Sequence, residues 1–596
     1  MEQTEETVAV EYTVAGSSLW KRAYPPVYVT NATDADGNAY TPGCYTTSIT
    51  GLREDTEYQV RVVVSDGEIH RTNSGMILTW DSTPEIAETV SLSDLGYTGS
   101  GPFIIDGDTN TTDGWLKISG GTIDAGKSPE AALSITGGRN IIFENVTIIG
   151  GKNHGVWIDA DSSQIRLVNC DISGWGRTGT LTNITTAADT TTKVAYVDAE
   201  GDSINYDAGI KVWGSQVTVE RCYIHAPSGT STPWSGSGNG LEWTSSHPKG
   251  MCGILAKAVN SVVRYNDIVG SEEHRFNDGI ESYGNSKNYG GFAKDSDIYG
   301  NMIAFGQDDG VEMDGGAQNL RFYNNRITNF YSGISTATNV IGPSFVFNNV
   351  VHHMRDGSDI PNLAMKNGGE GSGITHIFYN TFVTEQGRRD YGIASVGGYN
   401  AVSRNNIILG GQAVRGQVTT KAVEGFEAYN SFDYDLLANW NTTDNAGVID
   451  METGVNKEEN ALLGMPEFVD FASGCYGLDS GSLGFGAAVK VDGFAGSNMG
   501  AIDKSSTGLI PIRPMTQTAD KYVLTLSSGD SGIVTLSSDD YSEIQTNDDN
   551  IVVTADGNIL TITATGANGN DAMCIARYAD GTSVPVLVRI TLTKVG

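Results

Sequence analysis

Three carboxylic acids occupy matched places in two copies of a short repeated phrase. Residues 278–281 read Asp-Gly-Ile-Glu, and residues 309–314 read Asp-Gly-Val-Glu-Met-Asp. Alternate side chains of a strand point to opposite faces, so the aliphatic residues after Gly turn inward and Glu281, Glu312 and Asp314 face outward. Paired carboxylates on one face are the groups that acid/base hydrolysis of a glycosidic bond requires.

The expected spacing of these acids suits that chemistry. On neighbouring parallel strands, Glu281 and Glu312 stand roughly 5 Å apart, while Glu312 and Asp314 on one strand stand about 7 Å apart. The shorter spacing suits a nucleophile and an acid/base, and the longer leaves room for a water. Adjacent carboxylates also raise one another's pKa, which keeps one protonated. A calcium site is the alternative, with oxygens from Asp308, Asp309, Glu312 and Asp314.

Further copies of the phrase place aromatic and cationic side chains on the same outward face. Aromatic rings stack on sugars, and Lys binds hydroxyls, carboxylates or sulfates. The alternative is an ordinary solvated face. The candidate substrate-binding residues are Trp157, Lys211, Trp213, Lys257, Tyr283 and Lys366. Ala364, two places before Lys366, is assigned to the same face.

The loops that enter these strands carry imidazole and guanidinium groups. His274 could act as an acid or a base, or could be a turn residue bonded to backbone. Arg275 could hold a carboxylate or sulfate bidentately. His247 is placed at the same groove rim, a notable pairing because the chain has only 8 His.

A second phrase, with Asn two places before an aliphatic residue, accompanies the first. Its aliphatic positions are 268, 303, 327, 350, 382 and 408. Short alternating runs that end in Gly, Asn or Asp predict strands and turns, and their repetition predicts a solenoid. The Asn side chains should form an inward ladder between successive turns. Cys170 and Cys222 occupy the same position earlier, where buried thiols are expected.

With these phrases the chain, from about Gly96 to Asp503, resembles the right-handed parallel β-helix superfamily of pectate-lyase-like proteins. Residues 466–503 resemble the closing segment of that family. The resemblance implies a carbohydrate-active enzyme that is secreted or on the bacterial cell surface, although the fold carries many chemistries. Lyases of the superfamily use Lys or Arg as base, often with calcium, and Lys257 or Lys366 could fill that role. We find no convincing copy of the calcium-site Asp cluster of pectate lyases.

The expected fold is all-β, a right-handed parallel β-helix flanked by two small β-sandwich domains. The predicted domains are 1–82, 83–505 and 506–596. Residues 51–64 resemble the E–F corner of fibronectin type III domains, with Tyr58 at the turn. The strand signals after 506 resemble a bacterial immunoglobulin-like domain. Both sandwiches could be spacers, stabilisers or carbohydrate-binding modules.

Composition narrows the function. The chain has 71 acidic and 37 basic residues and a net charge of −34, which argues against a nucleic-acid or anionic-membrane binder. Its 6 Cys do not make a disulfide framework. No apolar run is long enough to span a membrane. No signal peptide is visible, and a monomer is expected.

The sequence therefore predicts a secreted, endo-acting glycoside hydrolase that cleaves an anionic polysaccharide, sulfated or rich in uronic acid, such as one from algae. Glu281 and either Glu312 or Asp314 would carry the chemistry, helped by His274, with no certain cofactor and calcium as the candidate. Two alternatives stay open. One is a polysaccharide lyase acting by β-elimination on a uronic-acid polymer, and the other is a non-catalytic polysaccharide-binding adhesin.

Overall fold

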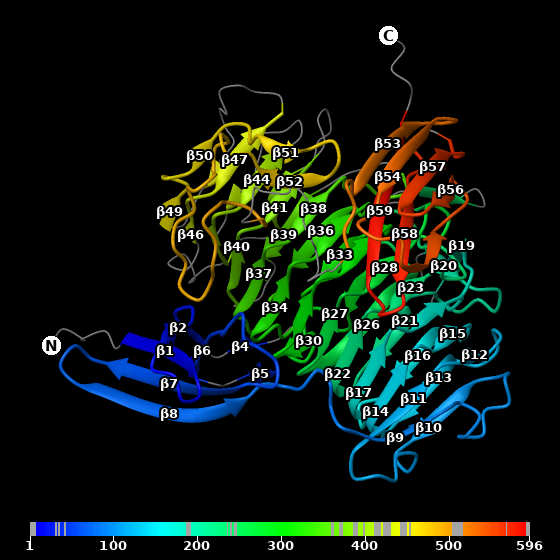
Figure 1. Cartoon of the computed structure of the whole chain (residues 1–596), viewed down its shortest axis with the longest axis horizontal. Helices are drawn as coiled ribbons and strands as arrows, with labels where there is room; N and C mark the ends of the chain where they lie inside the picture. Colours follow the sequence, from blue (N-terminus) through cyan, green and yellow to red (C-terminus); the bar gives the residue numbers. More distant parts are fainter. Residues whose placement is uncertain are drawn as a thin grey trace.

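The computed structural model of the chain is a long coil of short strands with a smaller β domain packed against each of two sides (Figure 1). The structure describes residues 7–29, 32–33, 36–40, 43–185, 192–234, 236–238, 241–243, 247–358, 363–368, 373–384, 391–396, 400–410, 419–420, 431–440, 450–451, 455–502, 517–567 and 569–591. Within these ranges there is no α-helix, and hence no helix long and apolar enough to cross a membrane.

Each turn of the coil adds one strand to each of three parallel faces. The first face, called the site sheet, holds β10 (Phe103–Asp106), β13 (Ala131–Thr136), β16 (His154–Ile158), β21 (Asp207–Val212), β26 (Met251–Val259), β29 (Ile280–Ser282), β33 (Asp309–Glu312), β36 (Ser332–Thr336), β39 (Leu363–Gly368) and β42 (Tyr391–Val396). Strand β26 is long enough to turn the corner, and it also pairs with strands of the second face.

The second face runs beside the site sheet. It holds β9 (Ile86–Val90), β11 (Trp115–Ser119), β14 (Arg139–Glu144), β17 (Ser163–Val168), β22 (Ser215–Glu220), β27 (Val262–Arg264), β30 (Gly291–Lys294), β31 (Asp297–Tyr299), β34 (Leu320–Tyr323), β37 (Ser344–Phe347), β40 (Thr375–Phe378), β43 (Ala401–Arg404), β46 (Ser431–Phe432) and β49 (Val455–Lys457).

The third face completes each turn. It holds β12 (Thr122–Asp124), β15 (Thr147–Ile149), β18 (Asp171–Ser173), β23 (Tyr223–His225), β28 (Asp267–Val269), β32 (Met302–Ala304), β35 (Arg326–Thr328), β38 (Val350–His352), β41 (Thr381–Val383), β44 (Ile407–Gly410), β47 (Leu436–Asn439) and β50 (Leu462–Leu463). All pairings within the three faces are parallel, so the predicted parallel β-helix is confirmed.

The register of the site sheet follows the Gly-aliphatic phrase. Val156 pairs with Ile210, and the same column continues through Ile254, Ile280 and Val311, all fully buried. The Gly before each aliphatic has a steric cause. A Cβ on Gly279 would lie 2.3 Å from Cγ2 of Ile303, which comes from the third face.

One predicted position on this sheet is wrong. Met365 pairs with Ile334 and Lys366 with Ser335, so Lys366 stands in the column of Glu281 and Glu312. Ala364 takes the place of the Gly and is fully buried instead of facing outward. The degenerate phrase left the register one residue ambiguous, and a shift of one residue exchanges the two faces of a strand.

The predicted Asn ladder is confirmed. Oδ1 of Asn301 accepts hydrogen bonds from the backbone N (3.0 Å) and Nδ2 (2.9 Å) of Asn266. The same pair of bonds recurs down the column, which ends at Oδ1 of Asp435. Cys222 stands one turn before the ladder and donates its backbone N–H to Asn266. Cys170 and Cys222 are buried free thiols, as expected.

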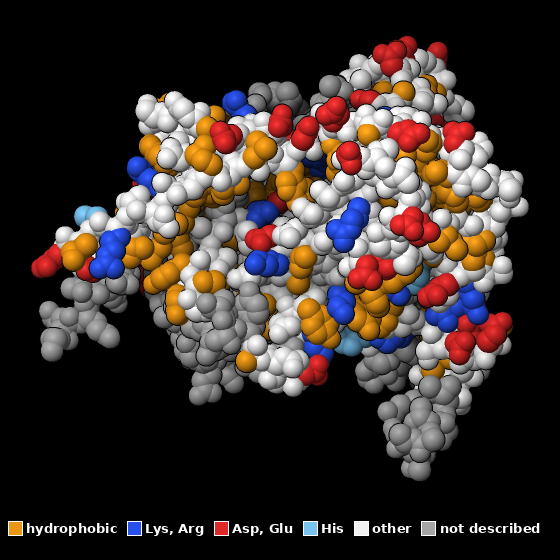
Figure 2. Space-filling view, turned by 90° about the horizontal axis from the view of Figure 1, so that it is seen from below, with side chains coloured by type: hydrophobic (Ala, Val, Ile, Leu, Met, Phe, Trp, Pro, Cys, Tyr) orange, Lys and Arg blue, Asp and Glu red, His pale blue; other side chains and the backbone are white. Residues whose placement is uncertain are grey.

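The N-terminal domain contains a four-stranded antiparallel sheet in the order β2 (Lys21–Arg22), β1 (Thr7–Val14), β7 (Glu57–Ser65), β8 (His70–Leu78). Two small pairs join it, β3 (Val27–Val29) with β6 (Cys44–Thr46) and β4 (Ala32–Thr33) with β5 (Ala39–Tyr40). The hydroxyl of Tyr58 accepts a hydrogen bond from the backbone N of Arg53 at 2.9 Å. The likeness to fibronectin type III domains stays a prediction. Strand β8 is exposed throughout, and hydrophobic side chains lie open on this domain at the left of Figure 2.

The C-terminal domain has two sheets around one apolar core. One sheet has the order β53 (Val523–Ser527), β59 (Ser583–Thr591), β58 (Ala572–Tyr578), β55 (Tyr541–Thr546), and the other β54 (Ser531–Thr535), β57 (Ile559–Ala564), β56 (Ile551–Asp556). Met573, Ile575 and Leu587 pack on the third face of the coil against Val269 and Phe305. The predicted boundary at 505 lies outside the described residues.

Four two-stranded sheets lie outside the three faces of the coil. They are β19 (Thr180–Thr185) with β20 (Thr192–Val197), β24 (Gly236–Gly238) with β25 (Leu241–Trp243), β45 (Thr419–Thr420) with β48 (Asp450–Met451), and β51 (Phe468–Asp470) with β52 (Cys475–Leu478). Tyr476 of the last pair packs on the third face against Val383 and Leu409.

Candidate active site

Six carboxylic acids gather on and beside β29 and β33. We call this set the acidic cluster: Asp278, Glu281, Asp308, Asp309, Glu312 and Asp314. Pairing of Ile280 with Val311 makes the two strands neighbours, as the repeated phrase predicts. One oxygen from each of Asp278, Glu281 and Glu312 lies within 4.8 Å of the others, and the same holds for Asp278, Asp308 and Asp309. Asp278 therefore belongs to both triads.

Five acids of the acidic cluster are buried and Glu312 is partly exposed, and some of the buried carboxylate oxygens lack a hydrogen bond. Asp309 is 0% exposed and Glu281 5% exposed. Oδ1 of Asp309 and Oε2 of Glu281 have no hydrogen-bond partner among the described residues. Lys366 supplies the nearest cation, with Nζ 2.6 Å from Oδ2 of Asp309. The charge of Lys249 also lowers the pKa of Glu281, but six carboxylic acids outnumber these two lysines and leave an excess of potential negative charge.

The few hydrogen bonds present orient individual acids. Asp278 accepts the backbone N–H of Asp309 and the amide of Asn277, both at 2.8 Å. Glu312 accepts the amide of Asn285 at 2.9 Å. Asp314 accepts the hydroxyl of Ser335 at 2.9 Å. The carboxylates are thus held in place without being neutralised.

Burial and mutual repulsion set the protonation of the acidic cluster. Burial raises the pKa of Glu281 to about 7, the pKa of Asp309 to about 7 and the pKa of Asp314 to about 6. Burial, followed by the charges of Asp314 and Glu281, raises the pKa of Glu312 well above its ordinary value. Burial alone would lower the pKa of Lys366, but Asp309 and the other acids outweigh it and raise that pKa.

The donor set of the acidic cluster fits a hard divalent cation such as calcium. Every candidate ligand is a carboxylate oxygen, which is the ligand type that calcium prefers. Leaving buried oxygens without a partner costs free energy, and a bound cation removes that cost. The sequence analysis considered Asp308, Asp309, Glu312 and Asp314 for this role. It missed Asp278, whose only signal was its place before the Gly of the phrase.

The loop at 231–249 supplies a rim beside the acidic cluster. Nε1 of Trp234 donates to Oδ1 of Asp308 at 3.0 Å, and its rings lie 5.2 Å from Tyr331. Nδ1 of His247 lies 3.6 Å from Oδ2 of Asp308. His247 therefore stands at the rim where the sequence analysis placed it, while Trp234 and Tyr331 were not among its candidates.

The predicted aromatic and cationic residues form one continuous strip on the site sheet. The ring centroids of Trp157 and Trp213 are 4.7 Å apart, and those of Trp213 and Tyr283 are 5.5 Å apart. Lys211 Nζ lies 4.5 Å from the ring centroid of Trp157, and Lys257 Nζ lies 5.4 Å from that of Trp213. The strip ends at Tyr283, two residues from Glu281, so it leads directly to the acidic cluster.

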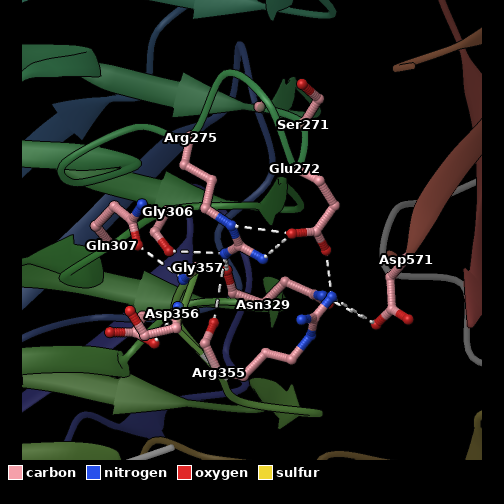
Figure 3. A network of polar contacts seen from close by, with 12 residues as sticks. Ser271, Glu272, Arg275, Gly306, Gln307, Asn329, Arg355, Asp356, Gly357 and Asp571 are labelled. Carbon is pink, nitrogen blue, oxygen red and sulfur yellow. Dashed lines mark hydrogen bonds and ion pairs between the residues drawn. The ribbon is translucent and has the colours of Figure 1, made fainter. Parts of the chain in front are cut away.

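Arg275 does not face the groove, which corrects its prediction as a substrate-binding residue. Its side chain is 0% exposed. Its guanidinium donates to Glu272 at 2.8 Å and to the carbonyls of Gly306 and Asn329 at 3.0 Å each (Figure 3). Glu272 in turn pairs with Arg355, which lies 3.5 Å from Asp571 of the C-terminal domain. All donors point into the protein, so Arg275 ties a loop to the coil.

His274 lies in a turn, and its Nδ1 is 3.1 Å from the carbonyl oxygen of Gly229. Its backbone carbonyl accepts the N–H of Ser271, which closes the turn. This geometry matches the turn interpretation that the sequence analysis left open beside the catalytic one. A ring nitrogen held by a backbone carbonyl is occupied, so we do not assign His274 a chemical role.

A scan against models of protein families and a search of curated proteins both found no match. Among solved structures, the chain is similar to pectate lyase Pel9A, with 11% identity over 69% of this chain and 98% of that one, and a TM-score of 0.34. It is also similar to the Agl-KA catalytic domain, with 13% identity over 78% of this chain and 85% of that one, and a TM-score of 0.31.

Likeness at this level assigns no activity to the chain. The strand pairing carries the conclusion on its own, because each turn places three strands in parallel register and aligns the Gly and Asn phrases. The chain is therefore a parallel β-helix protein, of the architecture that its repeated phrases resemble.

Proposed function

We propose that the protein is a polysaccharide lyase that cleaves a uronic-acid polymer by β-elimination on the site sheet. One observation carries the proposal, namely a buried carboxylate cluster with unpaired oxygens directly beside Lys366. Elimination from a uronate needs a cation to offset the substrate carboxylate and a base to remove the adjacent proton. The acidic cluster and Lys366 offer these two functions side by side.

Asp278 and its neighbours in the two triads would hold a calcium ion, whose positive charge would offset the substrate carboxylate and make the adjacent proton more acidic. With the negative charge of the acidic cluster offset by that ion, burial would lower the pKa of Lys366, and its neutral Nζ would accept the proton. The electron pair of the broken C–H bond forms the new double bond, the glycosidic C–O bond breaks, and the leaving oxygen takes a proton from solvent. The strip from Trp157 to Tyr283 holds the polymer by stacking on its sugar faces.

The structure favours Lys366 over Lys257 as the base. Lys366 contacts Asp309 inside the acidic cluster, whereas Lys257 packs over the rings of Trp213 and Tyr289. A base must reach the proton that it removes, so a side chain committed to ring faces farther along the strip is the poorer candidate.

Glycoside hydrolysis is the second candidate, and the spacing of Glu281 and Glu312 favours it. Their oxygens lie within 4.8 Å, close to the separation of about 5 Å that a nucleophile and an acid/base require. The raised pKa of Glu281, caused by burial, also suits an acid. Hydrolysis needs two carboxylates, however, and leaves the other four buried acids and their unpaired oxygens without a role.

One assay separates the candidates. The protein is incubated with a panel of uronic-acid and sulfated polysaccharides, with calcium or with a chelator. Elimination yields unsaturated ends that absorb ultraviolet light, and this reaction should require calcium. Hydrolysis yields reducing ends without that absorbance. Binding without either product would support an adhesin and sink both proposals. Secretion and a monomeric state stay predictions.

A further inference from the structure

A cleft opens beside the strip, at the corner where β26 passes from the site sheet to the second face. Its volume is about 380 Å³, in the size range of small-molecule sites. Its walls come from six successive turns of the coil and include Trp213, Lys257, Tyr289, Lys294, Gln318 and Ile341. The acidic cluster contributes no residue to it, so the cleft is a separate feature of the groove.

The lining of the cleft has the chemistry of an anionic sugar site. Lys257 Nζ lies 4.5 Å from the ring centroid of Tyr289 and 5.4 Å from that of Trp213. Lys294 extends into solvent, and its nearest described carboxylate is that of Asp295, at 3.9 Å. Two ammonium groups, two rings and the amide of Gln318 share one cavity of a chain whose net charge is −34. This is a local reversal of charge.

The N-terminal domain braces the walls of the cleft. Ile341 packs against Val29 of that domain, and Nε2 of Gln318 lies 3.4 Å from the hydroxyl of Thr46. Lys287, in the loop that carries Tyr289, forms an ion pair with Asp36. Contacts from a second domain hold three of the wall segments in place, so the cleft is formed before a ligand arrives.

We propose that this cleft is a subsite for an acidic sugar residue of the polymer, bound at a distance from the bond that is cleaved. The proposal rests on the proposed function, since it assigns an anionic substrate to the same groove. Lys257 and Lys294 pair with the carboxylate or sulfate, and Tyr289 stacks on the sugar ring. The enzyme then needs a chain long enough to reach from the acidic cluster, along the strip, into the cleft.

The test measures binding separately from cleavage. Lys257→Ala, Lys294→Ala and Tyr289→Ala are each placed in a Lys366→Ala background, which binds without turnover. Affinity electrophoresis with polygalacturonate, alginate, chondroitin sulfate and a neutral galactan gives the dissociation constants. Lys490→Ala is the matched control, because it removes one exposed Lys that does not line the cleft. Circular dichroism checks the fold, which Tyr289→Ala should keep because the side chain is 43% exposed.

We expect each cleft variant to weaken binding of an anionic polymer about tenfold, with a smaller loss at high salt, while Lys490→Ala changes nothing. Preference for uronate or sulfated polymers identifies the anionic group. Dissociation constants equal to those of Lys490→Ala, or tight binding of the neutral galactan, would overturn the subsite. Loss of binding without unsaturated product in the wild-type chain would instead sink the lyase proposal and leave the subsite standing.

Discussion

Two groups of buried charged residues meet on one loop, where Arg275 of the first group precedes Asp278 of the second by three residues. The first group has balanced charge, and the second does not. In the arginine network of Glu272, Arg275, Arg355 and Asp571, two cations meet two carboxylates, and Arg275 also donates to backbone carbonyls. The acidic cluster sets six acids against Lys366 and leaves oxygens unpaired. Matched buried charges hold parts of a fold together, whereas unmatched ones destabilise it unless a ligand completes them.

The arginine network also connects the coil to the C-terminal domain. Asp571 of the C-terminal domain contacts Arg355 and accepts a hydrogen bond from Asn329 at 3.1 Å. Through Glu272, Arg355 is linked to Arg275, which precedes Asp278 by three residues (Figure 3). The loop that enters the acidic cluster is therefore anchored by a domain that contributes nothing to the cluster itself.

The largest expected effect is on activity, when the acidic cluster loses the lysine that pairs with Asp309. Lys366→Ala should lower kcat by about 10²- to 10⁴-fold, the usual contribution of a general base. Polymer binding should persist, because the strip is unchanged. Steady-state assays in calcium measure the loss against Lys490→Ala. Retention of more than a tenth of the wild-type kcat would exclude Lys366 as the base.

Breaking the arginine network should lower the free energy of unfolding and leave the reaction unchanged. Asp571→Ala leaves Arg355 buried without one of its carboxylates, a loss of about 3–5 kcal/mol. Denaturant unfolding followed by fluorescence measures it, with the exposed Asp556→Ala on the same domain as control. Calcium affinity should stay within about twofold of wild type. A stable Asp571→Ala protein would show that the network contributes little to stability.

Substitution of one candidate calcium ligand in the acidic cluster should weaken the affinity for calcium. Asp278→Asn removes one charge from both triads and should weaken calcium binding about 10- to 100-fold. The unfolding temperature without calcium should rise or stay unchanged, because a repelling charge is lost. Calorimetric titration measures the affinity, and Asp556→Asn serves as control. Equal affinities in Asp278→Asn and wild type would argue against a cation at these triads.

The smallest expected effect is a pH dependence of the metal-free protein. Burial raises the pKa of Glu281 from 4.5 to about 7, so the folded chain holds a proton that the unfolded chain has released. Stability should therefore fall as pH rises from about 4.5 through about 7, by a few degrees in unfolding temperature. Calcium should remove the fall. Equal unfolding temperatures at pH 5 and pH 8 without calcium would contradict the idea that the acidic cluster carries uncompensated negative charge.

The sequence predicted a large part of the acidic cluster and little of the arginine network, for a physical reason. Glu281, Glu312 and Asp314 belong to copies of one phrase, and strand alternation turns their side chains to one face without reference to the rest of the chain. Arg275 carries no such signal. Its burial depends on Glu272, on carbonyls of later turns and on Asp571 in another domain, contacts that no local pattern encodes.

By itself, then, the sequence determined the coil, the inward ladder and the outward set of acids, rings and lysines. These follow from the alternation of side chains along each strand and from the return of the same phrase once in every turn of the coil. Only the tertiary structure decided that Asp278 joins both triads, that Lys366 stands in the column of Glu281 and Glu312, and that Arg275 is buried. These outcomes depend on how loops of unequal length bring distant turns into register and on where two flanking domains pack, and both are settled by contacts far apart in the chain.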